Sequence, residues 1–165
     1  MEEWILKGTD VRRWYGEGEV AVHALNGVSF EIRPREFVVV LGPSGSGKST
    51  FLNLLGGMDK ASGGELLYQN QNLSEMTERV LSNYRRNVVG FVFQFFHLIP
   101  TLTARENVEL SASITEGSRS AEEVLEKVGL AQRKEHFPSQ MSGGEQQRVS
   151  IARAIVKNPS ILLCD

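Results

Sequence analysis

The sequence is poor in cysteine, in proline and in long hydrophobic runs. It has one cysteine, Cys164, and five prolines among 165 residues. A single cysteine excludes an internal disulfide framework and a zinc site built on cysteine spacing, and it is typical of a reducing compartment. The longest apolar runs, such as Phe37–Leu41 and Ile161–Cys164, are far shorter than the ~20 residues of a membrane-spanning helix. The first residues, MEEW, lack the basic start and apolar core of a signal peptide.

Neither sign of charge dominates the composition. Lysine and arginine number 18, aspartate and glutamate 20, and the net charge is −2, so bulk binding of nucleic acid is not expected. The hydrophobic content of 41% and the charged content of 23% are normal for a globular protein. The length suits a single domain. If the protein serves a membrane process, we expect another chain to cross the membrane.

The first half of the sequence predicts strands followed by a glycine-rich loop and a helix. Ile5–Tyr15 and Val20–Ile32 are rich in strand-forming residues, and Arg33–Glu36 is expected to form a turn. Phe37–Leu41 is a continuous apolar run of the kind found in strands buried in a parallel sheet. A helix is expected over Lys48–Leu55, where Gly56-Gly57 then stops it.

The second half of the sequence is predicted to be mainly helical. Gly63-Gly64 is expected to interrupt regular structure, and Val88–Phe93 is a further strand candidate. Helices are predicted between Thr101 and Asn158, and Ile161–Cys164 is a last apolar strand. Possible capping boxes, in which Ser or Thr is followed three residues later by Glu, occur at Thr103-Ala-Arg-Glu106 and Ser120-Ala-Glu-Glu123.

The run GPSGSGKS at Gly42–Ser49 fits the pattern G-x-x-x-x-G-K-[ST]. Glycines let successive backbone N–H groups point at phosphate oxygens, and the helix that begins at Lys48 directs its positive end toward the same phosphates. An ordinary glycine-rich turn is the alternative, but the flanking strand and helix favour a phosphate loop for ATP with bound Mg²⁺. Lys48 is expected to reach the β- and γ-phosphates, and the Ser49 hydroxyl to bind Mg²⁺. The residues expected to line the nucleotide are Gly42, Pro43, Ser44, Gly45, Ser46, Gly47, Lys48, Ser49 and Thr50.

The run MSGGEQQR at Met141–Arg148 has two interpretations. Ser142 and Glu145 fit a capping box, so the run can be a plain helix start. Each of the two glycines, however, costs a helix ~1 kcal/mol relative to alanine. Glycine at these positions makes sense if the backbone must lie close to a ligand.

This run resembles the signature sequence of ATP-binding-cassette (ABC) proteins, and other positions along the whole chain resemble the same family. The resemblance implies that Ser142, Gly143 and Gly144 bind the γ-phosphate of ATP held by a second ABC subunit, in a head-to-tail dimer. It implies that Gln94 meets Mg²⁺ and the attacking water and links the site to an integral membrane permease subunit. Asp165, at the end of the last apolar run, resembles the acid that holds Mg²⁺.

An aromatic residue before the phosphate loop completes the resemblance. Tyr15 is similar to the residue that stacks on adenine in the family. Trp14 is a rival, and a packed aromatic is nearly as good an interpretation of either residue. The sequence around Tyr15 and the segment Phe93–Ala104 resemble those of macrolide-export, lipoprotein-release and related cell-envelope ATPases.

The chain departs from the family pattern at three places. Met141 replaces a leucine, which is a mild change in volume. Arg35 stands where the family usually has glycine, at a cost of about 1 kcal/mol if the turn needs a positive φ. No glutamate, D-loop or switch histidine follows Asp165, and the family's central strand is expected to be absent from the sheet. We therefore expect a partial version of a longer ATPase, which binds ATP weakly and does not turn it over.

The predicted fold is an α/β fold with a P-loop NTPase (RecA-like) core, an N-terminal antiparallel β subdomain, a helical insertion and an incomplete central sheet. Within a single domain over 1–165, the expected parts are 1–100 (β subdomain and core), 101–145 (helical) and 146–165 (signature helix and last strand). The expected function is that of an ABC transporter ATPase subunit in the cytoplasm, bound to the inner membrane face through its partner. The alternatives are a non-catalytic nucleotide-binding module and a non-transport ABC ATPase.

Overall fold

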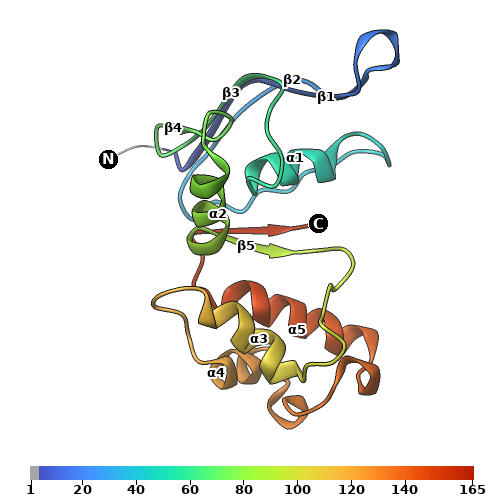
Figure 1. Ribbon diagram of the computed structural model, residues 1–165, viewed down its shortest axis with the longest axis vertical. Helices are drawn as coiled ribbons and strands as arrows, with labels where there is room; N and C mark the ends of the chain where they lie inside the picture. The colour runs from blue at the N-terminus through green and yellow to red at the C-terminus, as the bar shows by residue number, and fades with distance from the viewer. Residues whose placement is uncertain (1–3) are drawn as a thin grey trace. The chain divides into compact units, whose positions relative to one another are not determined.

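The computed structural model describes residues 4–165; residues 1–3, where the first predicted part begins, lie outside the described residues. The chain forms two compact units, Met1–Ser82 and Asn83–Asp165 (Figure 1). In chain order the helices and strands are β1 (Leu6–Tyr15), β2 (Val22–Ile32), α1 (Lys48–Leu55), β3 (Gly63–Tyr68), β4 (Gln71–Asn72), α2 (Glu78–Asn87), β5 (Val89–Val92), α3 (Ala104–Ser113), α4 (Ala121–Lys127), α5 (Gly143–Ile155) and β6 (Ile161–Cys164).

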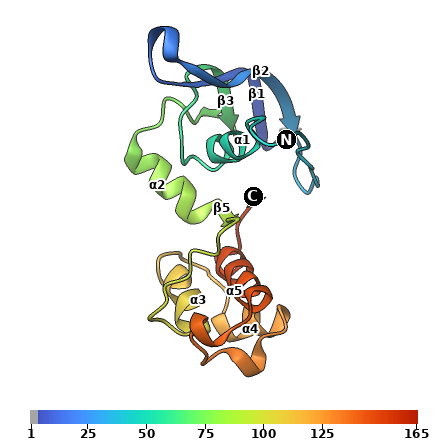
Figure 2. The ribbon, with the colours of Figure 1, turned by 90° about the vertical axis from the view of Figure 1, so that its right-hand side faces the viewer.

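The first unit is an antiparallel sheet with one helix packed on it. Its strand order is β2-β1-β3-β4, and Leu6 pairs with Ile32 on one side and with Tyr68 on the other. Helix α1 lies along one side of this sheet (Figure 2), where the ring of Phe51 meets the edge of Phe30 at 5.0 Å. These elements confirm the two predicted strands and the helix over Lys48–Leu55.

The apolar run Phe37–Leu41 does not form the predicted buried strand. It has no regular secondary structure, and Phe37 is 91% exposed and Leu41 86% exposed. No strand among residues 4–165 pairs with this run. A buried strand needs a partner strand to pair its backbone groups and other elements packed on the sheet to cover its side chains, and the run itself sets neither.

The sequence pattern predicted that Gly63-Gly64 interrupts regular structure, and this is wrong. The two glycines begin strand β3. Gly64 has φ +76°, and a Cβ atom there would lie 2.1 Å from the carbonyl oxygen of Asp10. The pairing register of β1 shifts between Thr9 and Arg12 at this place. The glycines therefore allow β3 to approach a bulge in β1, a use of glycine that also occurs in strands.

The predicted turn at Arg33–Glu36 is present and requires an unusual backbone conformation. Arg35 has φ +66°, the left-handed region that side chains disfavour. The amide of Glu36 donates to the carbonyl of Arg33 at 3.2 Å, and the Glu36 carboxylate accepts from the amide of Arg33 at 2.8 Å. The departure from glycine at position 35 thus falls where glycine would be favoured.

The second unit combines a two-stranded parallel sheet with helices α3, α4 and α5, and it includes the last turn of α2. Strands β5 and β6 pair in register from Val89 opposite Ile161 to Val92 opposite Cys164, which confirms both predicted strands. Helix α5 packs against β5, and helices α3, α4 and α5 pack against one another. Their shared core contains Ala104, Val108, Ala121, Val124, Leu125, Leu130, Met141, Val149, Ala152 and Val156.

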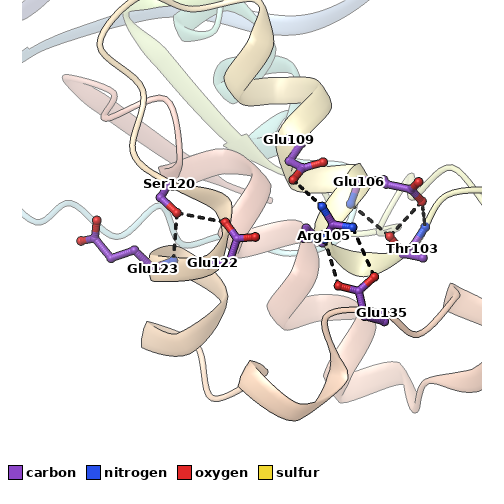
Figure 3. Close-up of polar contacts among 8 residues, drawn as sticks. All are labelled: Thr103, Arg105, Glu106, Glu109, Ser120, Glu122, Glu123 and Glu135. Carbon is purple, nitrogen blue, oxygen red and sulfur yellow. Dashed lines mark hydrogen bonds and ion pairs between the residues drawn. The ribbon is translucent and has the colours of Figure 1, made fainter.

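Side-chain caps define where the helices of the second unit begin. Thr103 accepts from the Glu106 amide, while the Glu106 carboxylate accepts from the Thr103 amide at 2.8 Å, so this capping box is complete (Figure 3). Ser120 caps α4 by accepting from the Glu123 amide. The Glu123 carboxylate pairs with Lys127 instead of returning to the cap, so the second predicted box has only one of its two arms.

Arg105 connects α3 to the segment that follows α4. Its guanidinium donates to Glu135 at 2.9 and 3.3 Å and to Glu109 at 2.9 Å (Figure 3). Both carboxylates raise the pKa of Arg105 above its ordinary value. All three side chains are partly exposed to solvent, which screens the pairs, so this network orients the segment more than it stabilises the fold.

No helix within residues 4–165 is both long and apolar enough to cross a membrane.

Candidate functional site

The phosphate loop (Gly42–Ser49) is an open turn whose last two residues, Lys48 and Ser49, begin α1. Gly45 and Gly47 have φ +76° and +88°, which glycine adopts at no steric cost. At Gly47 a Cβ atom would also lie 2.3 Å from the carbonyl oxygen of Ala24, so the loop ends in close contact with β2. Residues 42–46 are exposed. The backbone of the loop is therefore accessible at the surface, and one end of the loop contacts the sheet.

Lys48 closes the loop on itself. Its ammonium group donates to the carbonyl oxygens of Gly42 at 2.9 Å and Pro43 at 2.7 Å. The Ser46 amide also bonds to the Pro43 carbonyl at 3.3 Å. The Lys48 ammonium group places one positive charge beside the position proposed for the phosphate oxygens. Its two acceptors are neutral carbonyl oxygens, which an anion can replace as hydrogen-bond partners.

The start of α1 adds a second attraction for anions. The cap residue Gly47 has no side chain to bond to the first helical amides. A helix N-terminus carries a partial positive charge, and Ser49 and Thr50 place two hydroxyls in its first turn. Three features fit a phosphate chain with Mg²⁺: the glycine-rich loop, the ammonium group of Lys48, and the hydroxyls of Ser49 and Thr50. Mg²⁺ prefers oxygen ligands.

Tyr15 and Trp14 have different surroundings at the end of β1. The Tyr15 hydroxyl donates to Asp59 at 2.8 Å, and the Arg13 guanidinium lies 4.4 Å from the centre of its ring. Trp14 lies beside His23, with ring centres 6.1 Å apart. The structure therefore shows Tyr15 as a ring pinned by two polar groups and Trp14 as an aromatic packed against its neighbour strand.

Gln94 and Asp165 occupy the same edge of the parallel sheet. Strands β5 and β6 run side by side (Figure 1), and the Asp165 amide continues their pairing by donating to the Val92 carbonyl at 3.0 Å. Gln94 follows β5 after one intervening residue, Phe93, and is exposed. The carboxyl ends of parallel strands are where ligands bind in open α/β sheets. The second unit thus brings a carboxylate and an amide together at such an edge.

The loop that carries Gln94 is fastened to α5. Arg153 donates to the carbonyl oxygens of His97 at 2.5 Å and Phe96 at 2.8 Å. Burial of this guanidinium lowers the pKa of Arg153. The Phe93 ring also meets the edge of His97 at 5.0 Å. Sequence patterns did not reveal this contact because Arg153 lies 57 residues from Phe96.

The signature run (Met141–Arg148) begins α5. Ser142 is the cap: its hydroxyl accepts from the Glu145 amide at 3.3 Å, and its own amide donates to the Glu145 carboxylate at 2.8 Å. These bonds to Ser142 hold the pKa of Glu145 below its usual range. Met141 is buried in the helical core, which agrees with a mild change from leucine. The capping box at the start of α5 is therefore confirmed. It does not explain why glycine stands at positions 143 and 144.

No contact among residues 4–165 requires glycine at these two positions. A Cβ atom at Gly143 would meet no atom within 4 Å, and one at Gly144 would meet only the tip of Arg148 at 3.8 Å. Neither residue has a positive φ, and both are exposed. Packing within the part of the chain that the structure describes thus gives no reason for their small size.

Each unit assembles its own part of the predicted site. The first unit holds the phosphate loop and Tyr15, and the second holds Gln94, Asp165 and Ser142–Gly144. Comparison with known sequences decides which family uses this set. The sequence model of a family described as "ABC transporter" matches residues 25–165. The chain belongs to the ABC transporter family.

Relatives within the ABC transporter family match almost the whole chain. An ABC transporter ATP-binding protein of Thermotoga maritima is 47% identical over 98% of this chain, which spans 71% of that protein. A macrolide export ATP-binding/permease protein of Marinobacter nauticus is 45% identical, and the chain spans 26% of its length. Both of the sequence's expectations, the family and its likeness to macrolide-export proteins, are confirmed.

Solved ABC cassettes confirm the fold class. A dimeric ATP-binding cassette in a post-hydrolysis state, bound to ADP and Pi, matches with a TM-score of 0.88 and 44% identity. The match covers 97% of this chain and 73% of that one. A second dimeric ABC transporter cassette matches with a TM-score of 0.89. The chain is therefore a P-loop NTPase of the ABC type, an ATP-binding protein of a family of transport ATPases.

Proposed function

We propose that this chain binds ATP with Mg²⁺ as the nucleotide-binding subunit of a transporter and works as a head-to-tail pair. The observation that carries the proposal is the exposed pair Gly143-Gly144 at the start of α5, where a Cβ atom would meet almost nothing among residues 4–165. A group from outside the chain best explains their small size. Two solved cassettes that match this chain are dimeric, and the proposed group is the γ-phosphate on a second subunit.

The residues proposed to hold the nucleotide divide into three roles. The backbone amides of Gly42–Thr50 surround the phosphates, and Lys48 exchanges its loop carbonyls for β- and γ-phosphate oxygens. Ser142, Gly143 and Gly144 close the site from the partner subunit, and Tyr15 supports the base. Ser49, Gln94 and Asp165 offer a hydroxyl, an amide and a carboxylate to Mg²⁺, which when bound neutralises charge on the phosphates.

The polypeptide of residues 1–165 is proposed to bind ATP without sustained turnover when it is tested by itself. Gln94 can orient a water molecule, but an amide does not accept a proton at neutral pH. The general base that the family resemblance expects next to Asp165 is not among these residues. Sustained hydrolysis that disappears in Lys48→Ala would overturn this part of the proposal.

The role in transport rests on the relatives. Because a macrolide export ATP-binding/permease protein contains a region 45% identical to this chain, we propose that the chain couples ATP to export or envelope transport through a membrane permease. It would then sit on the cytoplasmic face of the membrane through that partner. The division into 1–100, 101–145 and 146–165 stays a proposal, with Gln94 as the residue that links the site to the permease.

The test compares ATP binding with ATP-dependent pairing of subunits. Isothermal titration calorimetry measures MgATP affinity, and analytical ultracentrifugation measures dimerisation with and without MgATP, for the natural chain, Lys48→Ala and Gly144→Ala. Lys48→Ala should abolish both. Gly144→Ala should retain binding to the single subunit and lose pairing, while its helix is stabilised by up to ~1 kcal/mol. Undiminished pairing of Gly144→Ala would contradict the proposed contact.

A further inference from the structure

The ring of Tyr15 is held by a small network at the end of β1. The Tyr15 hydroxyl donates to Oδ2 of Asp59 at 2.8 Å, and Nε of Arg13 donates to the same oxygen at 2.8 Å. The Arg13 guanidinium lies 4.4 Å from the centre of the Tyr15 ring, within the range of a cation–π contact. One aspartate therefore fixes both the ring and the cation that covers one of its faces.

Further bonds hold the members of this network in place. The side chains of Arg13 and Asp59 are each only 23% exposed, and the other Asp59 oxygen accepts from the Lys60 amide at 2.8 Å. Nη1 of Arg13 donates to the Ser62 hydroxyl oxygen at 3.2 Å. The Tyr15 residue itself remains 42% exposed. The ring thus has restricted rotation and an accessible surface at the same time.

The network also connects the ring to both ends of α1. Tyr15 pairs with Val22 on β2. Two residues further along β2, about 7 Å at the usual rise per residue, Ala24 touches Gly47 of the phosphate loop. Asp59 follows the other end of α1, where its amide donates to the Asn53 carbonyl at 3.3 Å. The ring is therefore held at a set position relative to the loop.

We propose that Arg13 and Asp59 are positioning residues that hold Tyr15 as a one-sided stacking platform for the purine base of the nucleotide. This inference rests on the proposed binding of ATP. The hydroxyl is engaged with Asp59 and the guanidinium covers one face, so the base binds the other face by stacking. A ring already held in place loses little conformational freedom when the base arrives, which increases affinity.

A merely structural role for the network would not depend on the base. The test therefore compares MgATP with magnesium tripolyphosphate, which has the phosphates and no base. Calorimetry on the 165-residue chain gives both affinities for the natural sequence, Asp59→Ala, Asp59→Asn and Arg13→Gln. Arg12→Gln is the matched control, because Arg12 lies on the same strand and pairs with Asp10 at 2.9 Å.

Base-selective loss of affinity is the expected result. Asp59→Ala removes the preorganisation of the ring but keeps its aromatic surface for stacking, so MgATP binding should weaken by about three- to tenfold. Tripolyphosphate binding should change by less than about twofold, because the phosphate loop is untouched. Asp59→Asn, which keeps an acceptor for the Tyr15 hydroxyl, and Arg13→Gln should lie between, and Arg12→Gln should match the natural chain.

Two other outcomes are distinguishable. If Asp59→Ala and Arg13→Gln leave the ratio of ATP to tripolyphosphate affinity at its natural value, the platform is wrong while ATP binding stands. If the natural chain binds neither ligand, the proposed function itself fails. Retained tripolyphosphate affinity also shows that a variant is folded around the loop. Should Asp59→Ala lose it, Tyr15→Phe, which removes only the hydroxyl, decides the question by the same ratio.

Discussion

Two apolar runs of similar composition have opposite fates in this molecule. Val89–Val92 forms strand β5, and all four of its residues are buried. Phe37–Leu41 has no regular structure, and every one of its residues is at least 36% exposed. Strand β5 pairs with β6 and is packed against α5. No strand among residues 4–165 pairs with the run before the phosphate loop.

The difference shows that apolar sequence alone does not make a buried strand. A strand needs hydrogen-bond partners for its backbone and a covered face for its side chains, and both come from distant parts of a chain. A helix depends less than a strand on distant parts of the chain, because its backbone hydrogen bonds form within the helix. Helix α1 forms beside an exposed run, because its hydrogen bonds are internal and because Leu54 and Leu55 are buried within the first unit.

The sharpest way to test this comparison is one substitution made in each run. Val92 is 3% exposed and Val39 is 61% exposed. Val92→Ala removes two buried methyl groups and should lower the free energy of unfolding by about 2 kcal/mol or more, whereas Val39→Ala should change it by less than about 0.5 kcal/mol. Urea denaturation followed by circular dichroism measures both. An equal cost for the two would mean that Phe37–Leu41 is buried in solution.

Acid should affect the second unit more than the first. Bonds to Thr103 and Ser142 hold the pKa values of Glu106 and Glu145 below the ordinary 4.5, and Lys7 does the same for Glu31 in the first unit. A lowered pKa in the folded state contributes stability above the unfolded value of about 4.5, and this stability is lost as the pH falls through the folded value. The caps of α3 and α5 should therefore weaken below about pH 4.5.

Helix content measured by circular dichroism between pH 6 and pH 3 tests this expectation. Glu106→Gln keeps an acceptor for the Thr103 amide and removes the titrating group, so its helix loss on acidification should be smaller. Glu116→Gln makes the same chemical change outside the caps and should leave the pH dependence unaltered. A pH dependence of Glu106→Gln identical to that of the natural chain would argue against the caps as the acid-sensitive element.

The features predicted from sequence were those set by neighbouring residues. Helix α1 begins and ends at the predicted residues because glycines stand on both sides of it. The complete capping boxes at Thr103 and Ser142 depend on a spacing of three residues. The contact of Arg13 with Asp59 spans 46 positions, and no local pattern predicts it.

Two errors have the same physical origin. The burial of Phe37–Leu41 and the role of Gly63-Gly64 both depend on a partner strand. For the glycines this partner is the bulge near Asp10, which only the sheet register reveals. The turn before α1 and the Ser142 cap were predictable from sequence because both are local arrangements, and the assignment of these residues to a nucleotide site stays a proposal. The residues that hold Tyr15 and the Gln94 loop in place were missed because they act across the fold.

The smallest expected effect lies in the turn directly before the exposed run. Arg35 has φ +66°, whereas Arg33, two residues earlier in the same turn, has an ordinary negative φ. Arg35→Gly removes the left-handed strain, which costs roughly 1–2 kcal/mol, but adds chain entropy to the unfolded state, so the net gain in unfolding free energy should be about 0.5–1 kcal/mol. Arg33→Gly removes the same charge without relieving strain and should destabilise the chain. Thermal denaturation of the two variants checks the sign. If both glycine variants lower the melting temperature, the backbone at position 35 is not strained in solution.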